Sequence, residues 1–174
     1  GYGGSPPPRP NLRFGPADEI GACEMTGDGL AEVTNPSALF LSDREKATPG
    51  SAVLAGIAGT RPVLTEIQAL VAPSPLGTPR RTALGLDPNR VALLAAVLEK
   101  KVGLEILPCD IFVNVAGGLS LDDPAADLAC AAALASSFRD RVIEARTLVL
   151  GEVGLAGEVR AVAQTSFADG EGGI

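Results

Sequence analysis

The residues with the clearest chemical pattern surround the expected start of a helix near position 124. Asp123 is a residue type that caps helices and Pro124 suits a first helical turn, while Asp122 and Asp127 flank them. A helix start can hold an anion through its free N–H groups. Three carboxylates would repel an anion and can accept those N–H groups themselves, so the pattern predicts capping. Ala125, at the centre, has no nucleophilic atom.

A second group consists of basic residues that lie close together in the chain. Its members are Arg80, Arg81, Arg90, Lys100 and Lys101, and the segment that they span also contains Asp87 and Glu99. We expect Arg80 and Arg81 on a surface loop, where a guanidinium could bind a phosphate through two hydrogen bonds. Arg90 is expected in a first helical turn, where the helix dipole disfavours a cation. This placement indicates an acidic partner, such as Asp87 or a group on a neighbouring subunit.

Two interpretations of this basic segment stay open. One is a set of salt bridges within or between subunits, and the other is contact with DNA. The segment has no aromatic side chain for base stacking, so contact with DNA would be made to the backbone and would be independent of sequence.

The composition excludes several kinds of site. Histidine is absent, which excludes Ser-His-Asp and Cys-His catalysis and removes the commonest transition-metal ligand. The cysteines, Cys23, Cys109 and Cys130, are odd in number and lack C-x-x-C spacing, so we expect buried thiols rather than disulfides or a zinc site. Cys130 lies more than one helical turn beyond Ala125 and is not expected to replace a nucleophile. The net charge of −7 argues against indiscriminate binding to nucleic acid or acidic membranes.

The expected elements place strands first and then strands alternating with helices. Strand patterns cover 19–25, 51–57 and 63–71, a long surface loop is expected over 72–86, and a capped helix begins at Asp87 and stops at Gly103. A buried strand over 111–115, a helix over 126–138 and short strands over 148–150 and 158–160 follow. This order predicts an α+β fold, with an α/β-type mixed sheet and helices.

The chain of 174 residues is long enough for one domain with a hydrophobic core. We expect residues 1–12 to be a flexible linker or a vector-derived remnant, residues 13–164 to form the domain, and residues 165–174 to be a disordered or altered tail. The chain has no apolar run of the roughly 18 residues that a membrane span needs, and no secretion leader is apparent. We therefore expect a cytoplasmic protein without a membrane partner.

Two segments, Leu121–Asp127 and Gly151–Arg160, resemble the active-site frame of Lon-type proteases. That family carries its serine nucleophile in a Pro-Ser-Ala-Gly turn and its lysine base further along the chain. Ala125 stands where the serine belongs, and Ser166 falls near the lysine position. The resemblance implies a Lon proteolytic-domain-like fold with a degenerate site at Ala125 and Ser166, and therefore no catalytic residue and no enzyme.

A longer resemblance is carried by motifs in collinear order from about residue 13 to about residue 162. The motifs are Arg13-Phe14-Gly15-Pro16, Asn35-Pro36-Ser37, Gly59-Thr60-Arg61-Pro62, the block Pro79–Val91, Val113-Asn114-Val115-Ala116-Gly117-Gly118 and Ala135–Arg139. Together they resemble the C-terminal Lon-like domain of the bacterial DNA-repair family RadA, also called Sms. The family's Lys-Asn-Arg-Phe-Gly motif appears here as Asn-Leu-Arg-Phe-Gly, so Arg13 alone is carried over as a nucleic-acid contact.

This resemblance implies a non-catalytic scaffold that contacts DNA within a hexameric ring. The full-length parent would be an ATP-driven motor for branch migration, with a RecA-type ATPase, a zinc finger and a RecA-type recombinase as partner. ATP, Mg and Zn would belong to those other domains. This chain contains no Gly-x-x-x-x-Gly-Lys-Ser/Thr motif, so we expect an excised domain without a cofactor.

An alternative function belongs to a different class. A degenerate relative of Lon-type peptidases could act as a free-standing module that binds peptides or proteins without cleaving them. The block Pro79–Val91 favours the DNA-repair interpretation, because the resemblance assigns that block to RadA and not to Lon proteases.

Overall fold

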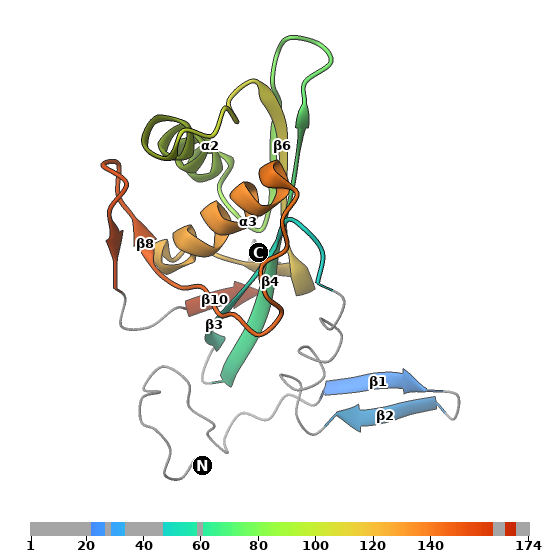
Figure 1. The fold of residues 1–174 in the computed structure, drawn as a ribbon. Coiled ribbons are helices and arrows are strands. Elements are labelled where there is room, and N and C mark those ends of the chain that lie inside the picture. The colour runs from blue at the N-terminus through green and yellow to red at the C-terminus, as the bar shows by residue number, and fades with distance from the viewer. Residues whose placement is uncertain (1–21, 27–28, 34–46, 59–60, 162–165, 170–174) are drawn as a thin grey trace.

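The computed structural model describes residues 22–26, 29–33, 47–58, 61–161 and 166–169 (Figure 1). Within these residues the main sheet has six strands in the order β5-β6-β4-β3-β10-β7. Their bounds are β3 Ser51–Ala58, β4 Arg61–Pro73, β5 Arg81–Leu84, β6 Cys109–Val115, β7 Leu119–Ser120 and β10 Ser166–Asp169. Strand β4 is antiparallel to β3 and β6, whereas β5 is parallel to β6 and β10 is parallel to β3. The sheet is therefore mixed, and the predicted α+β class is confirmed.

Two separate strand pairs accompany the main sheet. Strand β1 (Ala22–Thr26) pairs with β2 (Gly29–Val33), and β8 (Glu152–Val153) pairs with β9 (Val159–Arg160), both antiparallel. Leu148 forms only an isolated parallel bridge to Val53. The prediction of a strand over 148–150 is therefore wrong. The next strand, β8, begins a few residues later, at Glu152.

Local sequence explains why helix α2 (Pro88–Val97) begins where it does. The side chain of Asp87 accepts a hydrogen bond of 2.9 Å from the backbone of Asn89, and Pro88 occupies the first turn. The helix continues into a π-helical turn, η2 (Leu98–Val102), which ends at Gly103 with φ of +83°. Glycine adopts this left-handed conformation without a steric cost, so the predicted start and stop are both confirmed.

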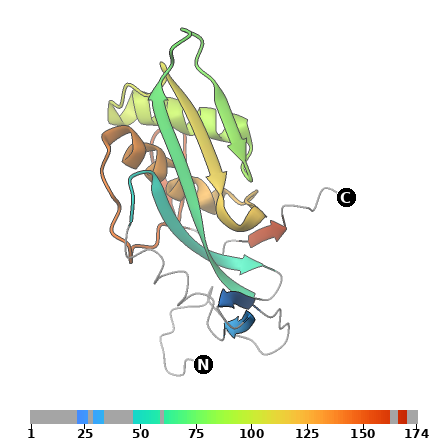
Figure 2. The same cartoon turned by 90° about the vertical axis from the view of Figure 1, so that its right-hand side faces the viewer.

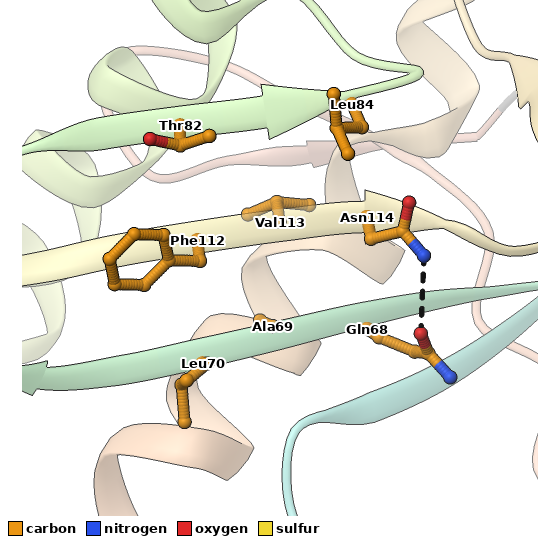
Figure 3. A pocket seen from close by; sticks show the side chains of 8 residues that line it. All are labelled: Gln68, Ala69, Leu70, Thr82, Leu84, Phe112, Val113 and Asn114. Atoms are coloured by element: carbon orange, nitrogen blue, oxygen red, sulfur yellow. Dashed lines mark hydrogen bonds between the residues drawn. The ribbon is translucent and has the colours of Figure 1, made fainter.

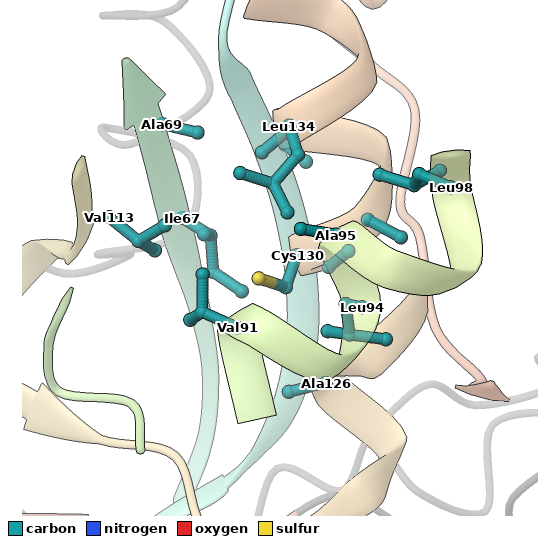
Figure 4. Close-up of a cluster of buried hydrophobic side chains, with 14 of the residues drawn as sticks. Ile67, Ala69, Val91, Leu94, Ala95, Leu98, Val113, Ala126, Cys130 and Leu134 are labelled. Carbon is teal, nitrogen blue, oxygen red and sulfur yellow. The ribbon is translucent and has the colours of Figure 1, made fainter. Parts of the chain in front are cut away.

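Helix α3 (Asp127–Arg139) follows two short 3-10 turns, η3 (Ala116–Gly118) and η4 (Pro124–Ala126). Helices α2 and α3 lie against the same face of the main sheet, as Figures 1 and 2 show. Between them and the sheet lies the core, in which Ile67, Leu94 and Leu134 are completely buried (Figure 4). Strand β4 alternates, with Ile67 facing this core and Leu70 60% exposed on the opposite face.

Two expectations about irregular segments are corrected by the fold. The loop expected over 72–86 contains the four-residue strand β5, whose Arg81 and Leu84 lie opposite Ile111 and Asn114 of β6. The tail expected over 165–174 contains β10, which pairs with β3 and β7. Strands β5 and β10 have four residues each, and each forms by pairing with a strand that is distant in the chain.

Candidate functional site

The turn that resembles a protease active site is closed by hydrogen bonds of its own. The carboxylate of Asp123 accepts a hydrogen bond of 2.9 Å from the N–H of Ala125, and the carbonyl of Asp123 accepts one of 3.0 Å from Ala126. The side chain of Ala125 is a methyl group that is completely buried. The predicted capping is confirmed, and these two N–H groups are not free to hold an anion. The side chain of Ser166 lies outside the described residues.

The structure brings together the two segments that the Lon-type resemblance singled out. The N–H of Gly151 donates to the carbonyl of Ala125 at 2.9 Å, and the N–H of Leu128 donates to the carbonyl of Gly151 at 2.9 Å. A Cβ atom on Gly151 would lie 3.0 Å from Cγ1 of Val159 and 3.3 Å from Cδ2 of Leu128, so a larger residue would require one of these side chains to shift. Two backbone hydrogen bonds therefore link the turn and the start of α3 to Gly151, just before the β8–β9 hairpin.

Buried Asp127 and half-buried Arg90 form an ion pair next to this turn. Asp127 is only 3% exposed, and its carboxylate accepts a hydrogen bond of 2.7 Å from Nε of Arg90 as well as one from Nη2. The same carboxylate accepts a hydrogen bond of 3.1 Å from the N–H of Val153. The hydrogen bond to Asp127 raises the pKa of Arg90 further above its ordinary value. One carboxylate thus links α2, α3 and β8.

This ion pair corrects the partner that the sequence indicated for Arg90. Neither Asp87 nor a neighbouring subunit is needed, because the acceptor is Asp127 of the same chain. Asp127 is 37 residues away in sequence, and its expected role was only to flank the helix start.

Arg81 is held by backbone carbonyls at the end of the sheet. Its guanidinium donates to the carbonyl oxygens of Cys109 at 2.6 Å, Leu107 at 2.9 Å and Arg80 at 3.2 Å. These bonds fix β5 beside the entry to β6. Arg81 is therefore a structural brace in this fold, and it lies on a strand rather than on the expected loop.

Arg80 is more accessible, although it also has a partner. Its guanidinium lies 3.2 Å from the carboxylate of Asp110 and 5.7 Å from the ring centre of Phe112, and its side chain is 59% exposed. The backbone N–H of Arg80 donates to Asp110 at 2.8 Å. This backbone hydrogen bond, followed by that from the Arg80 side chain, lowers the pKa of Asp110.

Lys100 and Lys101 are exposed at the carboxyl end of the helical segment α2–η2. Within the described part of the chain, neither takes part in a salt bridge. The structure also exposes Arg139 at the end of α3 and Arg141 and Arg146 after it, which sequence reasoning passed over because acidic residues are interleaved with them. Arg13 lies outside the described residues.

The two cysteines among the residues that the structure describes, Cys109 and Cys130, are buried free thiols. Burial raises the pKa of Cys130 to about 12, and burial likewise raises the pKa of Cys109. A thiol with a raised pKa is a poor nucleophile.

Among the described residues, no group of three or more His, Cys, Asp or Glu side chains is placed to hold a metal ion. None of the described helices combines the length and apolar character that crossing a membrane requires.

The fold and this site define an α+β domain in which a protease-like turn carries a buried methyl group. No family model matches the chain. Curated relatives named DNA repair protein RadA do match it, with 53% identity over 152 residues in Halalkalibacterium halodurans, 55% over 150 residues in Brucella abortus and 52% over 152 residues in Bacillus subtilis. The matches cover 87%, 86% and 87% of this chain.

The same matches cover 33%, 32% and 33% of the relatives, so the chain spans about a third of their length. The chain is therefore a homologue of RadA DNA repair proteins over one segment of them, and it is consistent with a RadA C-terminal domain.

Proposed function

We propose that this chain is a non-catalytic scaffold domain that contacts DNA in a RadA-type DNA repair protein. The observation that carries the proposal is the identity of about half of the aligned residues to proteins named DNA repair protein RadA. In the longer parent, this domain would be one part of a hexameric, ATP-driven motor for branch migration. ATP, Mg and Zn would bind to other domains of that parent, and a RecA-type recombinase would be its partner.

The absence of catalysis is supported by the chemistry of the closed turn. The side chain of Ala125 supplies no nucleophile, and the N–H of Ala125 is already bonded to Asp123. Cys130, on the helix that follows the turn, is a poor replacement because burial raises its pKa to about 12. Acyl transfer needs both an activated nucleophile and donors for the developing oxyanion.

Contact with DNA would fall to the cations that the fold leaves accessible. The guanidinium groups of Arg81 and Arg90 donate hydrogen bonds to partners within the chain. The side chains of Arg80, Lys100 and Lys101 are exposed. Lysine ammonium groups bind phosphates as point charges and do not read base edges. The proposed contact is therefore directed to the DNA backbone, and the overall charge of −7 makes it weak for a single copy.

The test combines native mass spectrometry with titration of a labelled DNA duplex at several salt concentrations. The proposal predicts assemblies larger than a monomer and an affinity that falls steeply with salt. A peptidase assay on the same sample should show no cleavage. A monomer that binds peptides and ignores duplex DNA at low salt would contradict the proposal and favour the peptide-binding module.

A further inference from the structure

The loop of the β8–β9 hairpin packs against the end of the helical segment that carries Lys100 and Lys101. A Cβ atom built on Gly157, in the loop, would lie 3.2 Å from Cβ and 3.3 Å from Cγ of Lys101. The aliphatic stem of Lys101 therefore lies against the backbone of the loop, and Figure 1 shows the hairpin beside the helical segment. Two segments that are distant in the sequence thus share one surface.

Hydrogen bonds of the hairpin hold its loop in one arrangement. The N–H of Gly154 donates to the carbonyl of Glu158, and the N–H of Gly157 donates to the carbonyl of Gly154, both at 2.9 Å. At the base of the hairpin, the N–H of Val153 donates to the carboxylate of Asp127 at 3.1 Å. The loop is thus preorganised, and little conformational entropy is lost when a ligand covers it.

This shared surface carries apolar side chains that face solvent. Leu155, inside the closed loop, is 69% exposed, and Val159 of β9 is 56% exposed. Val102, directly after Lys101, is 54% exposed. A lone exposed leucine is common on proteins, but these three side chains lie on the two segments that meet at Gly157. The surface therefore combines an apolar tip with neighbouring lysines.

The lysines beside the tip are left for an external anion. In the part of the chain that the structure describes, Lys100 and Lys101 are exposed and form no salt bridge. Two carboxylates on the same segments have partners within the chain. That of Glu99 accepts a backbone N–H at 3.1 Å, and that of Glu158 accepts a hydrogen bond of 3.2 Å from Arg160. Exposed ammonium groups of this kind suit the phosphates of a nucleic acid.

An exposed leucine beside phosphate-binding lysines suits DNA whose bases are accessible. Proteins that distort DNA insert apolar side chains such as leucine between base steps, and the cost is the unstacking of those bases. That cost is smallest where the bases are already unpaired. A leucine also does not read the hydrogen-bonding edges of bases, so such a contact is independent of sequence.

We propose that Lys100, Lys101 and the hairpin tip form the DNA-contacting surface of the domain, and that Leu155 packs against the faces of unpaired bases. The inference rests on the proposed function and specifies the form of DNA that the domain prefers. The lysines bind the phosphates of any DNA, whereas Leu155 adds affinity only where a strand is open. The preferred ligand is therefore a duplex with an unpaired stretch.

The test compares two labelled DNAs, a fully paired duplex and the same duplex with a central unpaired bubble, each titrated with the whole chain. Leu155→Ser should weaken binding to the bubble at least about tenfold and binding to the duplex less than about twofold. Leu155→Met keeps an apolar side chain of similar size and should bind the bubble like the wild type. Lys100→Ala/Lys101→Ala should weaken binding to both DNAs and reduce the salt slope by about two units.

Leu84→Ser is the matched control for the loss of an exposed leucine. Leu84 is 63% exposed and lines a hollow on the face of the sheet that the helices leave uncovered (Figure 3). The eight residues that line this hollow carry no charged side chain, so nothing among them binds phosphate. Leu84→Ser should bind both DNAs like the wild type, and circular dichroism checks that each variant is folded.

The possible failures separate this inference from the proposed function. If Leu155→Ser keeps wild-type affinity for the bubble, or loses affinity equally for both DNAs, the tip does not contact bases. The proposed function then still stands on the lysine variant. An equal loss in Leu84→Ser would overturn the assignment to the hairpin as well. Wild-type protein that binds neither DNA at low salt would overturn the proposed DNA contact together with this inference.

Discussion

At the scale of single residues, the sequence predicted the local interactions and missed the distant ones. Asp87 and Asp123 were predicted as helix caps because capping depends on neighbours two or three residues away. The pairing of Arg90 with Asp127 was missed because it joins two helices 37 residues apart, and no periodic pattern connects them. The unfavourable position of Arg90 in a first helical turn was the one available signal, and it indicated an acidic partner without identifying it.

The ion pair between Arg90 and Asp127 should contribute to stability. Replacing Arg90 with leucine leaves the carboxylate of Asp127 buried with a single remaining donor, the N–H of Val153. Because Arg90 is itself about one third exposed, we expect a loss of about 2 kcal/mol in the free energy of unfolding, less than for a fully buried pair. Urea denaturation followed by circular dichroism measures this change in the free energy of unfolding. Arg139→Leu, at an exposed position in α3, should change the stability by less than about 0.5 kcal/mol, and equal losses in both variants would contradict the assignment.

Cys130 should resist alkylation in the native protein. Burial raises its pKa from 9.0 to about 12, so the reactive thiolate is scarce near pH 8.5. Mass spectrometry after iodoacetamide treatment should find the Cys130 peptide unmodified until urea unfolds the chain. The thiol ionises first in the unfolded state, so its contribution to stability is lost as the pH rises from 9.0 towards about 12. Native labelling as fast as in the unfolded chain would refute the buried position.

At the scale of elements, patterns of several turns were predictable and short paired strands were not. The helix that begins after Asp87 and the strand within 111–115 follow from capping and from a continuous apolar run. Strand β5 has only four residues between proline and glycine, and it exists because it pairs with β6 in parallel. That pairing and two of the carbonyl contacts of Arg81 depend on residues 26 and 28 positions away, so the local sequence alone predicts a loop.

A pair of glycines tests how β5 is held in place. Gly85 and Gly77 both have positive φ, of +85° and +74°, so alanine is strained at either position. A Cβ atom on Gly85 would also lie 2.6 Å from the carbonyl oxygen of Leu119, whereas one on Gly77 would meet nothing within 4 Å. Gly77→Ala should therefore cost about 1 kcal/mol of stability and Gly85→Ala about 3 kcal/mol or more. Thermal unfolding of the two variants gives the comparison, and equal costs would contradict the close packing at Gly85.

At the scale of the whole molecule, the mixed sheet carries helices α2 and α3 on one of its faces. The sequence predicted the α+β class, because the order of strands and helices sets it. It did not predict the strand order, in which β10 lies between β3 and β7, or the exposure of Leu70 and Leu84 on one face of the sheet. Those features depend on pairing between distant segments, and they determine which surfaces remain for other molecules.

The central claim, that the domain contacts DNA through accessible cations, is tested most directly by the salt dependence of duplex binding. Lys100→Ala/Lys101→Ala removes two exposed cations of the predicted segment, and Arg139→Ala/Arg146→Ala removes two exposed cations elsewhere. Both double variants change the net charge equally. The account predicts that the lysine variant binds more weakly to every duplex sequence, with a slope of log K against log salt that is smaller by about two units, and that the arginine variant changes less. Wild-type affinity in the lysine variant, or an equal loss in both variants, would contradict it.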